Sequence, residues 1–420
     1  MLVVQKFGGS SVADLSKIRL VAEQIKQSHD AGNDLVIVVS AMQGETDRLI
    51  SLARQLSKLP EPRELDVLLA TGEQTTIALL CILLQELGCP AVSYTGQQVK
   101  IITDSAYNKA RIIDIQQENI RRDLQAGKVV VVAGFQGMDL EGNITTLGRG
   151  GSDTTAVALA AALQAVECQI YTDVDGVYTA DPRIVNNACK LERISFAAML
   201  ELASLGAKVL QIRSVELAWR YNVPLRVLST FSPGTGTLVT NEESVMEQRE
   251  VTGIACNRYE ARIALRGVSV DHGFISKVIG PLSAANIEVD MLTQNMTVAG
   301  QVDFSFTVNR ADLARTMSVI ESITNELQIS DILVDDRAAK LSIIGVGMRS
   351  HVAVISKMLR AIADIEVNIH LISTAETKVS VILDEKHLED SVRVLHEAFN
   401  LEQSVPFLTS VDGAQCLEKA

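Results

Sequence analysis

The sequence predicts an α/β protein, in which a central, mostly parallel sheet lies between helices and is followed by two smaller βαββαβ units. Two observations lead to this fold class. Over the first 230 or so residues, short β-branched runs alternate with helical patterns, which is typical of a sheet covered by helices. Beyond residue 250, the chain repeats itself at a fixed offset of 80 residues.

The strands of the first part are expected where apolar runs precede polar or glycine-bearing loops, and helices fill the gaps between them. Ligands of open α/β sheets bind at the carboxyl ends of the strands, so the loops that follow the strands are the candidate site. The expected strands are residues 2–6, 35–40, 92–95, 129–133, 169–173 and 225–228.

The repeat in the tail begins with Ile275-Ser276-Lys277, which recurs as Ile355-Ser356-Lys357. The apolar positions after each tripeptide keep the same phase through a helix and an alternating strand, which argues against chance. A Pro-Gly turn and a polar stretch precede the repeat. We therefore expect a first domain at 1–240, a linker with the strand leading into the tail at 241–261, and two units at 262–337 and 338–420.

The composition narrows the partners. A formal net charge of -13 argues against nucleic acid, whose phosphate backbone favours a basic surface. The six cysteines form no C-x-x-C pair, so we expect reduced, mostly buried thiols in a cytoplasmic protein, with neither a disulfide framework nor a zinc site. The start lacks the pattern of a signal peptide, and the longest apolar run, 77–84, is too short for a membrane span. A soluble protein is expected.

The first candidate motif is the start of the chain, where an apolar strand ends in Lys6-Phe7-Gly8-Gly9-Ser10-Ser11. Glycines let backbone amides approach phosphate oxygens, the lysine adds a positive charge, and Ser10 or Ser11 can cap the next helix. The lysine precedes the glycines, so this is not the common GxxxxGK[ST] loop. A structural strand-turn-helix explains the segment equally well.

The second motif, LGRGGSDTT at 147–155, opens a helix of small residues expected at 156–165. A helix N-terminus beside Arg149, whose guanidinium can grip a carboxylate or phosphate through two parallel hydrogen bonds, predicts an anion site. The alternative is a helix capped by Ser152 or Asp153, with Arg149 in solvent.

The third motif runs from Tyr171 to Arg183, where an apolar strand leads into a polar turn. Asp173 and Asp175 can orient a nucleotide or meet its magnesium, and Tyr178 and Arg183 can hold base and phosphate. For Asp175, an Asp-Gly turn within a hairpin is nearly as good an explanation.

Together these segments resemble the aspartate kinases of the amino-acid kinase superfamily, over essentially the whole chain. The tail resembles that family's paired ACT domains, ferredoxin-like modules that bind effector amino acids. The closest resemblance is to the monofunctional bacterial type. The motifs that carry it are KFGGSS at 6–11, SAM at 40–42 with Thr46, TGE at 71–73, FQG at 135–137, LGRGGSDTTA at 147–156 and TDVDGVYTADPR at 172–183.

The resemblance implies that ATP, carried with Mg²⁺, phosphorylates the side chain of L-aspartate to 4-phospho-L-aspartate. That carboxylate is already ionised at neutral pH, so no general base is needed. Lys6 is expected at the transferring phosphoryl group, with the amides of Gly8, Gly9 and Ser10, and Asp153 as the residue that orients Lys6 or the substrate amine.

The resemblance also assigns two subsites. Glu73 is expected to meet the amino group of aspartate and Arg149 its carboxylate. The further aspartate-binding residues are Ser40, Thr46, Gly150, Gly151 and Ser152. The ATP-binding residues, besides Lys6, are Phe7, Gly8, Gly9, Ser10, Ser40, Thr172, Asp173, Tyr178, Arg183 and Lys208. No protein-bound metal is expected.

For the tail, the resemblance implies feedback control by lysine, threonine or both. The expected effector contacts are Asp271, Asp290, Gln294, Asn295, Asn368, Ile369 and Thr374. Relatives commonly carry Pro-Gly before each helix, whereas this chain has Asp271-His272-Gly273 and His351-Val352-Ala353. We therefore expect effector binding more in the first unit than in the second. The simplest role for the repeat is dimerisation, so we expect a homodimer. Assembly into a heterotetramer with a separate regulatory subunit is an alternative.

Two other functions fit parts of the sequence. Another kinase of the superfamily, acting on acetylglutamate, glutamate or UMP, would share the glycine-rich phosphate loops but lack this start together with a paired tail. A noncatalytic amino-acid sensor would keep the fold. The presence of Lys6, Glu73, Arg149, Asp153 and Lys208 argues against a sensor.

Overall fold

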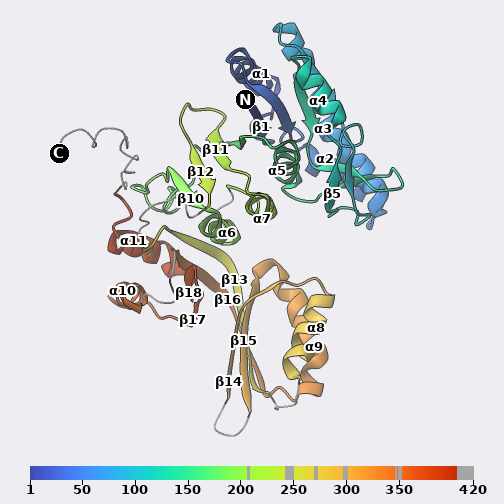
Figure 1. Cartoon of the computed structure of the whole chain (residues 1–420). Coiled ribbons are helices and arrows are strands. Elements are labelled where there is room, and N and C mark those ends of the chain that lie inside the picture. The colour runs from blue at the N-terminus through green and yellow to red at the C-terminus, as the bar shows by residue number, and fades with distance from the viewer. Residues whose placement is uncertain are drawn as a thin grey trace, which may run out of the picture.

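The computed structural model describes residues 1–205, 209–241, 250–268, 273–296, 301–345, 348 and 352–403. An N-terminal α/β domain is followed by a tail of two smaller units (Figure 1). The domain contains an eight-stranded sheet in the order β10-β12-β11-β9-β1-β2-β6-β3. Its strands are β1 Leu2–Phe7, β2 Asp34–Val39, β3 Ala91–Tyr94, β6 Val129–Ala133, β9 Glu167–Thr172, β10 Arg193–Ser195, β11 Leu225–Ser229 and β12 Thr237–Thr240.

All six strands expected from the sequence are present, with ends displaced by at most two residues. The sheet is mostly parallel, and only the β11–β12 pair is antiparallel. β1 lies between β9 and β2, so its carboxyl end is flanked by the ends of two parallel neighbours. This arrangement gathers the polar loops after β1, β2 and β9 at one edge of the sheet.

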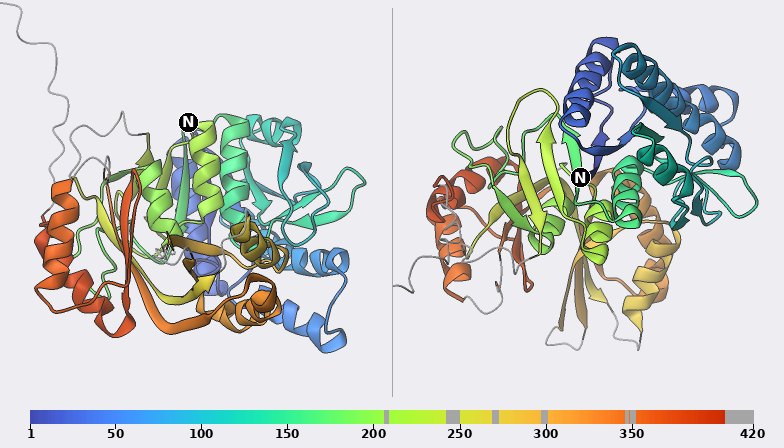
Figure 2. Two further views of the ribbon diagram at one scale, coloured as in Figure 1. Left: turned by 90° about the horizontal axis from the view of Figure 1, so that it is seen from below. Right: turned by 45° about the horizontal axis from the view of Figure 1, so that its top comes forward.

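Helices cover both faces of this sheet, as Figure 2 shows from two further directions. One face packs against α4, α5, α6 and α7, and the other packs against α1 and α3. The helices are α1 Leu15–Asp30, α2 Glu45–Leu56, α3 Pro62–Glu86, α4 Glu118–Gln125, α5 Gly151–Leu163, α6 Phe196–Ser204 and α7 Ile212–Tyr221. A four-stranded sheet beside them has the order β5-β4-β7-β8, with β4 Ile101–Thr103, β5 Ile112–Ile115, β7 Gln136–Met138 and β8 Ile144–Thr146.

α3 is long and apolar enough to cross a membrane by length and composition, and it alone meets that test among the described residues. Half of its most apolar window is buried inside the fold, where Leu80 and Leu84 pack against the sheet. Two carboxylates, Asp66 and Glu73, are also buried on it. Such burial is typical of a core helix in a globular domain.

The tail forms one six-stranded sheet in the order β14-β15-β13-β16-β18-β17. Its strands are β13 Gly253–Val268, β14 Val289–Met296, β15 Val302–Asn309, β16 Asp331–Ile344, β17 Leu371–Thr374 and β18 Lys378–Asp384. Its helices are α8 Phe274–Ala284, α9 Leu313–Leu327, α10 Val352–Ala363 and α11 Leu388–Ala398, with single 3₁₀ turns at Arg310–Asp312 and Glu385–His387.

β13 and β16 are long because each belongs to both units. Residues 260–266 of β13 pair with 331–338 of β16, and residues 253–257 pair with 340–344. The first tail unit is therefore 260–336. The second tail unit is 338–403 plus the strand 253–257, which precedes the first unit in the chain. Residues 241–261 were expected outside both units, because a strand that joins the second unit from before the first one leaves no mark in the 80-residue repeat.

The described cysteines are free thiols, as expected from their spacing in the sequence. Cys81, Cys89 and Cys168 are buried free thiols, and Cys189 and Cys256 are free and partly buried. Burial raises the pKa of Cys81 to about 12, which keeps this thiol protonated. Cys416 lies outside the described residues.

Candidate active site

Lys6 lies near the end of β1 and forms an ion pair with Asp153 in the first turn of α5. The distance from Lys6 Nζ to Asp153 Oδ1 is 2.6 Å, and the two side chains are only 11% and 10% exposed. Val4, two residues earlier on the same face of the strand, belongs to the core under α5. Strand alternation therefore directs Lys6 towards the N-terminus of α5.

The glycines after Lys6 are required by close contacts. A Cβ on Gly8 would lie 3.2 Å from Lys6 Nζ, and one on Gly9 would lie 3.1 Å from the carbonyl oxygen of Ala41. The Gly8 amide donates to the carbonyl of Tyr171 at 3.3 Å. Among the described residues, the amides of Gly9 and Ser10 donate to no protein acceptor. Of the three amides expected to bind phosphate, only those of Gly9 and Ser10 are therefore available.

Two details of this segment differ from the prediction. Neither Ser10 nor Ser11 caps α1, because the cap is Asp14, which accepts from the Lys17 amide at 3.0 Å. Ser11 instead shares a 2.6 Å hydrogen bond with Thr230, which lies 219 residues away. Phe7 is fully buried and stacks on Tyr171 with ring centroids 4.6 Å apart, so its side chain belongs to the core.

Glu73 has the most unusual environment in the site. It lies in the middle of α3 and is 3% exposed. Its Oε1 accepts from the Ala41 amide at 2.9 Å, whereas Oε2 has no hydrogen-bond partner among the described residues. Burial raises the pKa of Glu73 to about 7, against an ordinary value of 4.5, although the Ala41 amide opposes the shift. An unpaired buried carboxylate oxygen is costly, and a cation would satisfy it.

Two hydroxyls predicted for the site follow β2. The Ser40 amide donates to the carbonyl of Phe7 at 3.1 Å, which joins the ends of β2 and β1. Thr46 lies in the first turn of α2, after a left-handed Gly44. Both side chains are half-buried. Because Ala41 bonds Glu73 and also contacts Gly9, this loop connects the lysine strand to the buried carboxylate.

The loop from Leu147 to Gly151 bends sharply into α5. Gly150, with φ of 72°, precedes the helix, and a Cβ there would lie 1.8 Å from Gln211 Cγ. α5 begins at Gly151 and ends at Leu163, so the expected start at 156 was five residues late. Small residues carry little apolar signal, which hid the first turn.

No side chain caps α5, so the alternative with Ser152 or Asp153 as a cap is wrong. Asp153 instead pairs with Lys6, and Ser152 packs against Gly134 at the end of β6. Arg149 is exposed, and no partner for it is present among the described residues. In the first turn of α5, the amides of Gly151 and Asp153 already donate to carbonyls of the preceding loop. Among the described residues the Ser152 amide has no acceptor, so this amide and the Arg149 guanidinium remain available to an anion.

The segment after β9 holds the predicted nucleotide residues. Asp173 is exposed and accepts from the Thr172 hydroxyl at 3.0 Å. Asp175 is bonded to the Tyr178 hydroxyl at 2.8 Å and to Lys190 at 3.2 Å, which favours the structural alternative for this residue. Arg183 is exposed and forms a paired contact with Asp181, with its closest N–O distance at 2.7 Å.

Sequence reasoning missed the residues that hold the Arg149 loop. Asp66, fully buried on α3, accepts from the amides of Asn108 and Thr146 and from the Thr146 hydroxyl. Arg213 on α7 donates to the carbonyls of Leu147 and Ala110 at 3.0 and 2.8 Å. A charged residue inside an apolar helix pattern was the available signal for Asp66. Nothing local marks Arg213.

Of the predicted effector residues that the structure describes, Asp290, Gln294, Asn295 and Thr374 lie on the edge strands β14 and β17, and two more lie just before β17. Asp290 forms an ion pair with Lys340, whose side chain is 3% exposed. Met291 and Leu371, at the starts of β14 and β17, share an apolar cluster with Ala338 and Ile382, so both edge strands begin near one place. Gln294, Asn295, Asn368 and Thr374 are exposed, and Ile369 is half-buried. Lys208 and Asp271 lie outside the described residues.

Comparisons with known proteins identify the family of this chain. Residues 1–229 match the amino acid kinase family, and residues 341–399 match an ACT domain. An aspartate kinase of Pseudomonas putida is 59% identical over 402 residues, which are 96% of this chain and 98% of that protein.

Two solved structures have the same fold over nearly the whole chain. The crystal structure of Escherichia coli aspartokinase III in complex with aspartate and ADP has a TM-score of 0.79 at 25% identity, covering 95% of this chain and 99% of that one. The complex of that enzyme with lysine and aspartate has a TM-score of 0.77 at 26% identity and the same coverage. With this fold, this site and these relatives, the chain belongs to the aspartate kinases of the amino acid kinase family.

Proposed function

We propose that this aspartate kinase performs its reaction where the ends of β1 and β2 meet α3 and α5. There ATP phosphorylates the side-chain carboxylate of L-aspartate to give ADP and 4-phospho-L-aspartate, the first step towards lysine, threonine and methionine. The observation that carries the proposal is the ion pair of Lys6 and Asp153 at the N-terminus of α5. It holds a positive charge beside free backbone amides, at the edge of the sheet where ligands bind.

The main barrier is repulsion between the attacking carboxylate and the γ-phosphate. Phosphoryl transfer depends chiefly on positioning and on stabilising the charge that spreads over the phosphoryl oxygens. Lys6 offsets this charge, and the amides of Gly9 and Ser10 share the oxygens. Asp153 orients Lys6. Because the substrate carboxylate is ionised at neutral pH, no residue has to remove a proton from it.

The aspartate subsite lies between Glu73 and Arg149. The unpaired Oε2 of Glu73 receives the α-amino group, and its burial strengthens this contact. Arg149 binds the α-carboxylate, since its exposed guanidinium follows a left-handed glycine and lies close in the chain to the unbonded Ser152 amide of α5. The remaining contacts come from Ser40, Thr46, Gly150, Gly151 and Ser152.

The nucleotide subsite is assigned to the segment after β9. Tyr178 and Arg183 hold the nucleotide together with Lys208. Mg²⁺ accompanies ATP and neutralises phosphate charge there. Of the two aspartates predicted to meet Mg²⁺, Asp173 fits, because it is exposed and, within the described part of the chain, bonds only the Thr172 hydroxyl. Asp175 does not fit, because Tyr178 and Lys190 already occupy it.

We also propose that the tail dimerises and binds effector amino acids. Exposed apolar side chains on the strands of the tail sheet, including Leu292, Met296, Leu333 and Ile372, would be covered by a second copy. Lysine is the effector suggested by the complex of the E. coli enzyme. Asp290, Gln294 and Asn295, with Asn368, Ile369 and Thr374, are its proposed contacts. We place the enzyme in the cytoplasm.

The reaction is tested by trapping the acyl phosphate with hydroxylamine. We expect hydroxamate to form with ATP, Mg²⁺ and L-aspartate, and only at background level with glutamate or acetylglutamate, because Glu73 and Arg149 together fit a free amino acid of one length. Equal rates with acetylglutamate, whose amine is blocked, would contradict the Glu73 subsite. If no acceptor gave hydroxamate, the result would support a noncatalytic amino-acid sensor.

Regulation is tested by assaying the same reaction with lysine, threonine and both. We expect inhibition by at least one of them, and loss of that inhibition in Gln294→Ala, which removes an exposed side chain that makes no contribution to the core. Gln301→Ala, at another polar position in the same unit, serves as the control. No response to either amino acid would leave dimerisation as the role of the tail.

A further inference from the structure

The segment that follows β9 leaves the kinase sheet and packs into the second tail unit. Ala180, Ile184 and Val185 are buried in the same apolar cluster as Leu341 of β16 and Leu395 of α11. In Figure 1 this part of the chain lies beside α11 and the upper end of β13. Residues of the kinase domain therefore form part of the apolar core of the second tail unit.

A buried hydrogen bond joins this segment to α11. His396 Nε2 lies 3.0 Å from Thr179 Oγ1, and each residue is only 1% exposed. The Thr179 hydroxyl oxygen also accepts from the Cys189 amide at 3.0 Å, and it keeps a lone pair and a proton with which it can bond either tautomer of the imidazole. The Thr179 backbone carbonyl accepts from Ile254 of β13 at 2.7 Å. Thr179 is thus held by the second tail unit through both its side chain and its backbone.

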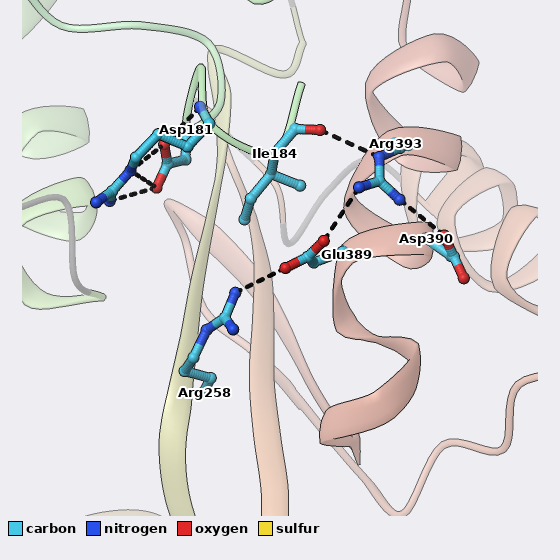
Figure 3. A network of polar contacts seen from close by, with 7 residues as sticks. Asp181, Ile184, Arg258, Glu389, Asp390 and Arg393 are labelled. Atoms are coloured by element: carbon cyan, nitrogen blue, oxygen red, sulfur yellow. Dashed lines mark hydrogen bonds and ion pairs between the residues drawn. The ribbon is translucent and has the colours of Figure 1, made fainter. Parts of the chain in front are cut away.

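A second set of contacts holds the far end of the segment, as Figure 3 shows. Arg393 of α11 donates to the carbonyl of Ile184 at 3.1 Å and pairs with Glu389. Glu389 in turn pairs with Arg258 of β13. Between the two attachments, Asp181 fixes the side chain of Arg183.

We infer that α11 positions the nucleotide subsite and that His396 is the positioning residue, although it touches neither substrate. Thr179 directly follows Tyr178 and lies four residues before Arg183, so its anchor sets where both side chains point. The inference rests on the proposed assignment of residues 172–183 to ATP. It makes the second tail unit a structural part of the ATP subsite, while the aspartate subsite of Glu73 and Arg149 is held by other elements.

The test compares His396→Gln with His396→Asn in the full-length enzyme. Glutamine places its terminal amide about where Nε2 lies and can either accept from the Thr179 hydroxyl or donate to it, whereas asparagine is one methylene too short. We expect His396→Asn to raise the KM for ATP about three- to tenfold, the range that one hydrogen bond supports, with little change in the KM for aspartate. His396→Gln should retain most of the normal KM for ATP. Thr179→Val, which removes the hydroxyl, and Thr179→Ser, which keeps it, form the matching pair at the other end of the hydrogen bond.

Ser391→Ala is the control for general damage to α11. Ser391 is fully buried and donates to the carbonyl of His387 within its own chain segment, so its loss destabilises the helix without touching the kinase domain. We expect it to lower the midpoint of thermal unfolding but leave both KM values unchanged. Equal rises in both KM values for His396→Asn, or the same ATP effect in Ser391→Ala, would overturn the inference.

Arg183→Ala, measured alongside by calorimetric binding of ADP, separates this inference from the proposed subsite. Arg183 is mostly exposed, so its loss should not disturb the fold. Weaker ADP binding in Arg183→Ala with normal binding in His396→Asn would overturn the positioning role alone. Normal binding in both would overturn the assignment of the segment to ATP.

Discussion

Replacing Lys6 with alanine is expected to lower kcat by about a thousandfold or more. The lysine supplies the charge that offsets repulsion between the two reacting anions, and removal of a single such group from a preorganised site costs factors of this order. Because its role is exerted on the transferring phosphoryl group, raising either substrate should not restore the rate. The measurement is turnover at saturating ATP and aspartate, with the midpoint of thermal unfolding recorded for the same samples.

The ion pair complicates this variant, because Lys6→Ala leaves Asp153 buried without its partner, at a cost of about 3 kcal/mol in the free energy of unfolding. The double variant Lys6→Ala with Asp153→Asn removes both charges and should recover stability without recovering activity. Lys128→Ala is the matched control and should remain active. It also takes a lysine from a buried carboxylate, Asp123, which keeps Arg122 and Tyr94 as partners. Near-normal aspartate phosphorylation by Lys6→Ala would exclude the proposed role.

Much of the kinase domain could be predicted from the sequence because its signals are local. Buried parallel strands are continuous β-branched runs, such as residues 129–133, and glycines mark the sharp turns after them. Lys6, Glu73 and Asp153 could be proposed for the site because each belongs to a motif, and the structure brings Lys6 and Asp153 into contact. Their proximity follows from strand order, which places β1 beside β2.

The features that escaped prediction depend on contacts between distant residues. Ser11 was available to cap α1, but Thr230 competes for its hydroxyl from 219 positions away. The strand 253–257 joins the second tail unit through pairing with residues 340–344, which no repeat pattern encodes. The unpaired oxygen of Glu73 could not be foreseen either, because it requires knowing that the Ala41 amide takes only one of the two oxygens.

The second large effect is expected for Glu73→Gln, which should raise the KM for aspartate about a hundredfold and leave the KM for ATP almost unchanged. A buried charge-assisted contact to the substrate amine is lost, and the neutral amide that replaces the carboxylate cannot compensate. Arg149→Ala should show the same selectivity from the other end of the substrate. Equal losses for both substrates in either variant would exclude the proposed aspartate subsite.

The pH dependence gives a sharper test, since the pKa of Glu73 is raised to about 7 in the enzyme without substrate. Only the ionised carboxylate attracts the ammonium group, so kcat/KM for aspartate should fall as the pH drops below about 7. The same fall should be absent from kcat/KM for aspartate in Glu73→Gln. A parallel fall in the variant would assign the titration to another group.

The stability of the fold should depend on pH in the opposite sense to aspartate binding. A carboxyl whose pKa is higher in the folded than in the unfolded chain binds more protons when folded, so the free energy of unfolding falls as the pH rises from about 4.5 to about 7. Above that window, the ionised Glu73 costs up to about 3 kcal/mol, and Glu73→Gln should recover part of it. A variant that is more stable at pH 8 yet binds aspartate poorly would mean that the buried carboxylate is kept for the substrate. Chemical denaturation of both proteins at pH 5 and pH 8 measures the difference directly, and equal gains at both values would contradict a titrating Glu73.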